Sequence, residues 1–137
     1  VGVPYMGAFA ASKFGLEAVS ESLHFEVAQR GIRVHLIEPG RFATNFGDSR
    51  EHPPGWIGSQ QEKRAEAFRV ASAGIGSDSE PADAQEVADA IARASTDPST
   101  PFRTLVGGDA ELIDGLKSSM TFEQFESTIR TALDWHD

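Results

Sequence analysis

The sequence predicts an α/β fold that forms one part of a larger parallel sheet. Its apolar patterns follow the order helix, strand, helix, helix, strand, helix, helix, and this alternation is typical of α/β layers. Only two segments have the character of strands, and a two-stranded sheet is marginally stable alone. We therefore expect about two strands and five helices at the edge of a sheet that needs further strands.

The composition indicates a single globular domain and excludes several classes of function. The chain has 137 residues and a formal charge of −9 without clustered basic residues, which argues against binding to nucleic acid. Its four histidines are scattered without the spacing of a metal site. No apolar run approaches the roughly 20 residues of a membrane span, and no signal peptide is visible. We expect a cytoplasmic protein, and Val1 suggests a fragment, a processed product or a misread start codon.

The first helix is predicted over residues 4–30, beginning near Pro4 and ending before Gly31. It carries two apolar stripes at helical spacing. One stripe consists of Leu16, Val19, Leu23 and Val27, and the second of Phe14, Ala18, Ser22 and Phe25. A helix that is apolar on two sides is expected to be buried on two sides, against a sheet and against a second helix from this chain or from a partner.

The remaining elements follow from short apolar runs and from capping patterns. Residues 32–38 (IRVHLIE) form a β-branched run that ends at Pro39-Gly40 and predicts a strand. Residues 41–80 are loop-rich, with a helix that begins at the capping pattern Ser59-Gln60-Gln61-Glu62 and extends to about Ala73. A helix over 83–96 is predicted to begin at the cap Asp83, and a second strand follows over 102–107. C-terminal helices over 110–135, the last of which begins at the capping pattern Thr121-Phe122-Glu123-Gln124, complete the single partial domain 1–137.

Several motifs occur in an order that is informative as a set. Phe9-Ala10-Ala11-Ser12-Lys13 opens the first helix, and the following strand runs into Glu38-Pro39-Gly40 and then Thr44. The segments VADAI (87–91) and RTLVGGDAELI (103–113) come later. Together they resemble the second half of a short-chain dehydrogenase/reductase (SDR), in which a helix carries Tyr-x-x-x-Lys and the next strand ends in Pro-Gly-x-x-x-Thr. The resemblance implies a Rossmann-like doubly wound parallel sheet without its N-terminal nucleotide-binding strands.

The resemblance also implies roles for particular residues in the first helix. Lys13 matches the lysine that binds the nicotinamide ribose and lowers the pKa of the catalytic tyrosine through its positive charge. Phe9 occupies the position of that tyrosine, and its phenyl ring has no proton to give. General acid–base help is worth about 10²–10⁴-fold in rate, so ordinary carbonyl reduction is expected to be severely slowed.

Further matches lie after the first strand. Pro39, Gly40, Phe42 and Thr44 match the loop that holds the nicotinamide carboxamide in the family, where glycine allows the backbone to approach the ring. The helix over 59–73 matches the family's substrate lid, with Trp56, Ile57 and Phe68 as candidate lid residues. The alternatives are a plain strand-ending turn and ordinary surface packing.

Some parts that this chemistry needs have no counterpart in the sequence. No glycine-rich turn of the G-x-G-x-x-G type follows a strand, and the family's catalytic serine would precede Val1. The complete family protein would use NAD or NADP, and we expect no cofactor binding by this chain alone. No metal site is predicted.

Three functions remain open at this point. The chain is expected to be a fragment or truncated relative of an NAD(P)-dependent short-chain oxidoreductase acting on a carbonyl or alcohol, inactive in isolation. The alternatives are a non-catalytic interaction or dimerisation module and one half of a split reductase. The expected partners are the missing N-terminal half or a second copy of the chain, with a homo-oligomer formed through the first helix.

Overall fold

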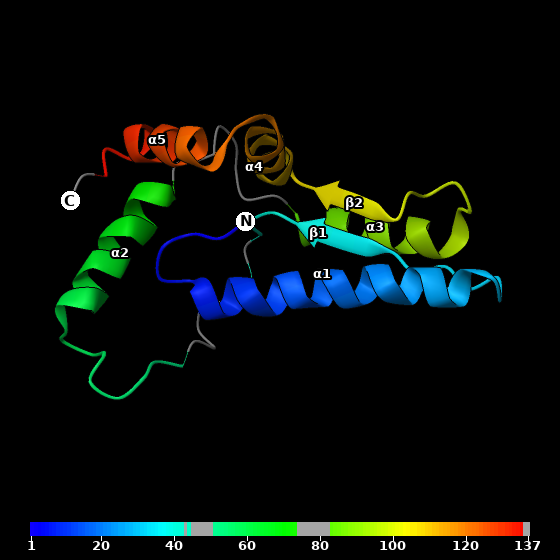
Figure 1. Ribbon diagram of the computed structural model, residues 1–137, viewed down its shortest axis with the longest axis horizontal. Helices are drawn as coiled ribbons and strands as arrows, with labels where there is room; N and C mark the ends of the chain where they lie inside the picture. The colour runs from blue at the N-terminus through cyan, green and yellow to red at the C-terminus, as the bar shows by residue number, and fades with distance from the viewer. Residues whose placement is uncertain (43, 45–50, 74–82, 136–137) are drawn as a thin grey trace.

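The computed structural model describes residues 1–42, 44, 51–73 and 83–135 (Figure 1). Within them it contains five helices and two strands in an α/β arrangement, as the sequence predicts. The elements are α1 (Gly7–Ala28), β1 (Leu36–Pro39), α2 (Gln60–Ser72), α3 (Ala84–Thr96), β2 (Arg103–Val106), α4 (Gly108–Ser119) and α5 (Phe122–Ala132). The fold is consistent with part of a Rossmann-like sheet.

The two strands pair in parallel, with Leu36 opposite Arg103 and Pro39 opposite Val106. The prediction of a strand over 32–38 is wrong at its start, because β1 begins only at Leu36. The register explains the difference: β2 begins at Arg103, so the residues before Leu36 have no strand to pair with among the described residues. In that same part of the chain β1 has one neighbour, and its other edge carries no strand.

Helix α1 is the longest element, and it runs beside β1 in the opposite direction (Figure 1). Gly31, with φ of 71°, provides the left-handed turn predicted after the helix. No residue of α1 is buried in the part of the chain that the structure describes, so this chain's own described elements do not provide the expected burial on two sides. Val19 and Phe25 are 65% and 80% exposed. The reason is that two strands cover too little of the helix and that, among the described residues, no second helix buries its apolar side chains.

The two faces of the sheet have different neighbours because side chains alternate along a strand. Ile37 shares its face with α3, whose Ala94 lines a common groove with it. Glu38 and Arg103 point to the other face, where Arg103 pairs with Glu17 and Glu21 of α1. The buried apolar residues are few and are spread over several elements: Leu36, Phe68, Ala90, Ala94, Val106, Phe125 and Leu133.

Three predicted helix starts are confirmed by their caps. The side chain of Ser59 accepts a hydrogen bond from the Glu62 N–H, and Asp83 accepts from Gln85 N–H. Thr121 and Gln124 form a reciprocal capping box at the start of α5. The C-terminal helical region 110–135 consists of two helices, and α4 begins at Gly108, earlier than predicted, because Gly107 with φ of 99° already turns the chain.

One sequence prediction extends beyond what the structure describes. Parts of the predicted lid region 41–80, including the loop 74–80, lie outside the described residues. Among the residues that are described, no helix combines the length and the apolar character needed to cross a bilayer.

Candidate functional site

The predicted catalytic pair lies at the start of α1. Phe9 and Lys13 are one helical turn apart, and Lys13 Nζ lies 5.5 Å from the centre of the Phe9 ring. The Ser12 hydroxyl donates to the Phe9 carbonyl at 2.7 Å, so Ser12 is bound to its own helix. Lys13 is exposed and Phe9 is 39% exposed, which leaves both side chains accessible. The ammonium group thus faces an aromatic ring with no ionisable proton.

The predicted cofactor loop begins at the end of β1. The Gly40 N–H donates to the Val106 carbonyl at 2.9 Å, which extends the pairing of the strands by one residue. Because α1 and β1 run in opposite directions, the start of α1 and the end of β1 lie at the same end of the layer (Figure 1). In open α/β sheets this carboxyl end of the strands is where ligands bind.

Gly40 faces a carboxylate. A Cβ atom built on Gly40 would lie 1.9 Å from Asp109 Oδ1 and 2.6 Å from Asp109 Cγ. The next backbone amide, Arg41 N–H, donates to Asp109 Oδ2 at 2.8 Å. Glycine at this position is therefore explained by the close approach of Asp109, a neighbour that the sequence analysis missed. Asp109 lies 68 residues after Arg41 in the sequence, so no local sequence pattern indicates their contact.

The other two residues of the predicted loop differ in their surroundings. Phe42 is half-buried, and its ring lies 3.6 Å from where a Cβ of Gly107 would be. Thr44 is exposed. The structure therefore brings Pro39, Gly40 and Phe42 close to the start of α4, and leaves Thr44 at the surface.

The three candidate lid residues do not form a common surface. Trp56 stacks on His52 with ring centres 5.5 Å apart, and Ile57 is 84% exposed. Phe68 of α2 is buried, and its ring contacts Tyr5 at 6.5 Å and Trp135 at 5.3 Å. Phe68 therefore joins α2 to both ends of the described chain, and its role in this structure is packing.

An ion-pair network links α1 to both strands. Arg103 Nη1 lies 3.2 Å from Glu17 Oε2, Arg103 Nη2 lies 3.2 Å from Glu21 Oε1, and Nη1 also bonds Glu38. Partial burial raises the pKa of the Glu38 carboxyl above its usual value, and the nearby Arg103 charge opposes this without cancelling it. The network fastens α1 to the sheet and holds more negative than positive charge.

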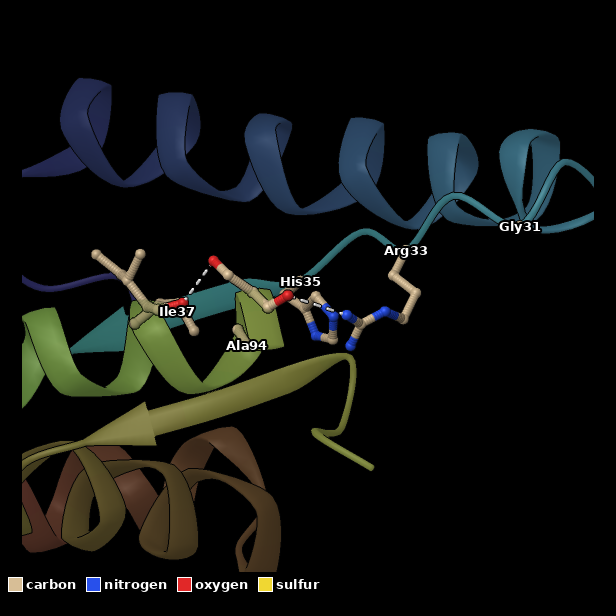
Figure 2. Close-up of a pocket in the computed structure, with 7 residues that line it drawn as sticks. Gly31, Arg33, His35, Ile37 and Ala94 are labelled. Carbon is tan, nitrogen blue, oxygen red and sulfur yellow. Dashed lines mark hydrogen bonds between the residues drawn. The ribbon is translucent and has the colours of Figure 1, made fainter. Parts of the chain in front are cut away.

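A groove lies beside the start of β1 rather than at its end (Figure 2). It is lined by Gly31, Arg33, His35, Ile37 and Ala94, together with neighbours on α3. Arg33 donates to the Asp97 and Ser95 carbonyls, and His35 Nδ1 lies 2.9 Å from the Pro101 carbonyl. The groove thus lies on the side of the sheet that α3 covers, toward the start of β1 and away from the predicted cofactor loop.

Lys13 is exposed and fits a ribose hydroxyl as a hydrogen-bond donor. The phenyl ring of Phe9 has no group that can donate or accept a proton. The space beside the Cα atom of Gly40 is occupied by the Asp109 carboxylate. Among the described residues no group of three or more His, Asp or Glu side chains could hold a metal ion.

Comparison with known proteins finds a family match in the N-terminal part of the chain. Residues 1–54, which contain α1 and β1, match the family model of short chain dehydrogenases. Residues 1–54 are a short-chain dehydrogenase/reductase segment. The segment includes every residue that the sequence analysis assigned to the catalytic and cofactor positions.

Several curated SDR relatives are similar over parts of the chain. The 3-ketodihydrosphingosine reductase of Bacteroides thetaiotaomicron is 41% identical over 68 residues, which are 50% of this chain and 24% of the relative. The uncharacterized oxidoreductase YbbO of Escherichia coli K12 is 49% identical over 49 residues, 36% of this chain and 18% of that protein.

Human retinol dehydrogenase 5 is 58% identical over 38 residues, 28% of this chain and 12% of its own length. The matched segments thus span a quarter or less of these three relatives. No solved structure matches the chain.

Proposed function

We propose that this chain supplies the C-terminal flank of an NAD(P)-dependent short-chain oxidoreductase that acts on a carbonyl or alcohol substrate. The supporting observation is the arrangement of two motifs, since Phe9–Lys13 opens α1 and Pro39–Gly40 ends β1 at the same end of the layer. In this proposal Lys13 binds the nicotinamide ribose. The loop of Pro39, Gly40, Phe42 and Thr44 contacts the carboxamide.

The bound nicotinamide would supply the hydride chemistry, and the chain would supply position and charge. Phe9 cannot donate or accept the proton that carbonyl reduction requires, so the proposal includes little or no turnover by this chain alone. The open edge of β1 gives a place for a further strand, which supports a missing N-terminal half as the partner. A split reductase, in which that half is a separate chain, is the related alternative.

Restoring the phenol tests the catalytic part of the proposal. The chain is joined to the part of the Bacteroides reductase that lies outside the matched segment, and Phe9→Tyr is compared with the unchanged chimera. We expect a gain of about 10²–10⁴-fold in kcat/KM for a carbonyl substrate. Phe14→Tyr is the matched control, because Phe14 is also an exposed phenylalanine of α1 and should give no gain. Equal rates for both variants would contradict the proposal.

A non-catalytic interaction module is the second candidate, and the exposed apolar surface of α1 favours it. Leu16, Val19 and Phe25 are between 54% and 80% exposed on one helix. Burying apolar surface stabilises an association by about 25 cal/mol per Å², so covering these side chains favours binding of a partner. In this second candidate function the partner is a second copy of the chain.

Size-exclusion chromatography tests this association. We expect the chain to elute as a dimer or larger, and Phe25→Asp with Val19→Asp to elute as a monomer. Ile57→Asp is the control because Ile57 is 84% exposed and lies outside α1. A monomeric unmodified chain, or dissociation by Ile57→Asp alone, would count against the α1 interface.

A further inference from the structure

Arg41 follows the Pro39–Gly40 loop directly and is attached to α4 in two ways. Its backbone N–H donates to Asp109 Oδ2 at 2.8 Å, and its guanidinium Nε lies 3.5 Å from the same oxygen. Asp109 is in the first turn of α4, with a side chain only 17% exposed, and its Oδ1 accepts from the Ala110 N–H at 3.0 Å. A carboxylate is favourable near a helix N-terminus, so Asp109 is well placed to hold the loop.

The same guanidinium group also reaches α2. Arg41 Nη1 donates to the carbonyl oxygen of Ser72 at 2.7 Å, and Ser72 is the last residue of α2. The last carbonyl groups of a helix have no partner within the helix and carry partial negative charge. One arginine therefore connects a carboxylate on α4, the loop after β1 and the C-terminal end of α2. We call these groups the Arg41 bridge: Arg41, the Asp109 carboxylate and the Ser72 carbonyl.

We propose that Arg41 and Asp109 are positioning residues that set the Pro39–Gly40 loop and α2 relative to one another. This rests on the proposed function, in which the loop contacts the nicotinamide and α2 belongs to the substrate-lid region. Neither residue takes part in proton or hydride transfer. Their effect is to make the geometry of the cofactor loop depend on the position of α2.

The rest of α2 has a separate attachment, which makes the effect of the bridge local. Phe68 is buried between Tyr5 and Trp135, one turn before the end of the helix. Loss of the bridge should therefore loosen the last turn of α2 and the loop without releasing the whole helix. The last-turn amide of Ala73, which bonds the Arg69 and Val70 carbonyls, is a suitable reporter.

Amide hydrogen exchange of the 137-residue chain tests the bridge. We expect Arg41→Ala and Asp109→Asn each to speed exchange at the end of α2 and at residue 41 by about three- to tenfold. The expected change is small because the Arg41 side chain is half-exposed, and solvent weakens an ion pair of this kind. Arg41→Lys keeps the charge but lacks the fork that reaches both partners, so it should give an intermediate rate.

Arg69→Ala is the matched control. Arg69 is on the same turn of α2, but it pairs only with Glu66 on the helix surface among the described contacts. An equal acceleration by Arg69→Ala would overturn the proposal, as would unchanged exchange in both Arg41→Ala and Asp109→Asn. An Asp109→Asn effect confined to α4, with α2 unaffected, would also overturn it.

These outcomes are separate from those of the proposed function because exchange requires no cofactor. In the active Phe9→Tyr chimera, Arg41→Ala should raise the KM for the nicotinamide cofactor while kcat changes less than twofold. A loss of kcat with an unchanged KM would contradict a positioning role. Failure of Phe9→Tyr to restore turnover would refute the proposed function and leave the exchange result intact.

Discussion

Gly40→Ala is predicted to destabilise the chain through a single neighbour, Asp109. A Cβ at residue 40 would lie 1.9, 2.6 and 2.8 Å from three atoms of the Asp109 carboxylate group. These distances are far below ordinary van der Waals contact, so the carboxylate must move by roughly 1–2 Å. The movement breaks its bond with the Arg41 N–H or shifts the backbone.

The cost follows from these two possibilities. A hydrogen bond to a charged group contributes about 1.5–3 kcal/mol, and overpacking a well-filled site costs about 1–3 kcal/mol. Replacing glycine by alanine restricts the unfolded chain and returns about 0.4–1 kcal/mol, because no left-handed φ is required at residue 40. The net loss in the free energy of unfolding is therefore expected to be about 1–2 kcal/mol.

A double-mutant cycle measured by urea unfolding separates this mechanism from others. In the Asp109→Ala background the three clashing atoms are absent, and Gly40→Ala should be neutral or slightly stabilising. Gly115→Ala is the control, since Gly115 is in α4 with nothing within 4 Å of its built Cβ and should stabilise the chain by about 0.5–1 kcal/mol. A Gly40→Ala cost that is the same with and without Asp109 would refute the reasoning.

Two further predictions concern the network around Arg103. Burial in the folded state raises the pKa of the Glu38 carboxyl. The stabilisation that comes from its protonated form is therefore complete below the unfolded-state pKa and is lost as the pH rises through the folded-state pKa. Glu38→Gln should therefore gain stability relative to the unmodified chain as the pH rises through the range in which the Glu38 carboxyl ionises, measured by urea unfolding, and a relative loss would contradict the sign. Arg103→Met should cost about 1 kcal/mol at low ionic strength, because the arginine is 37% exposed and pairs with carboxylates on α1 and β1. The difference from the unmodified chain should shrink in high salt, and a salt-independent cost would indicate lost packing instead.

Local features of the fold could be predicted from the sequence because their partners are near in the chain. The caps at Ser59 and Thr121 bond amides three residues away, and the turn at Gly31 depends on its own φ. The Phe9–Lys13 contact follows from helical spacing in the same way.

Features that depend on distant neighbours could not be predicted. The start of β1 is set by its register with Arg103, which the run 32–38 does not encode. The exposure of Val19 and Phe25 depends on which elements cover α1, while an apolar stripe indicates only that cover is required. Asp109 was missed as a neighbour of Gly40 because a lone aspartate after Gly107-Gly108 resembles any helix start.

Titration with NADH and NADPH, followed by nucleotide fluorescence, tests the central claim most directly. The claim is that these residues form one flank of a nucleotide-binding layer and cannot hold the dinucleotide by themselves. We predict no saturable signal from the 137-residue chain and saturable binding by the chimera that contains the rest of the Bacteroides reductase. Micromolar binding by the isolated chain would contradict the account.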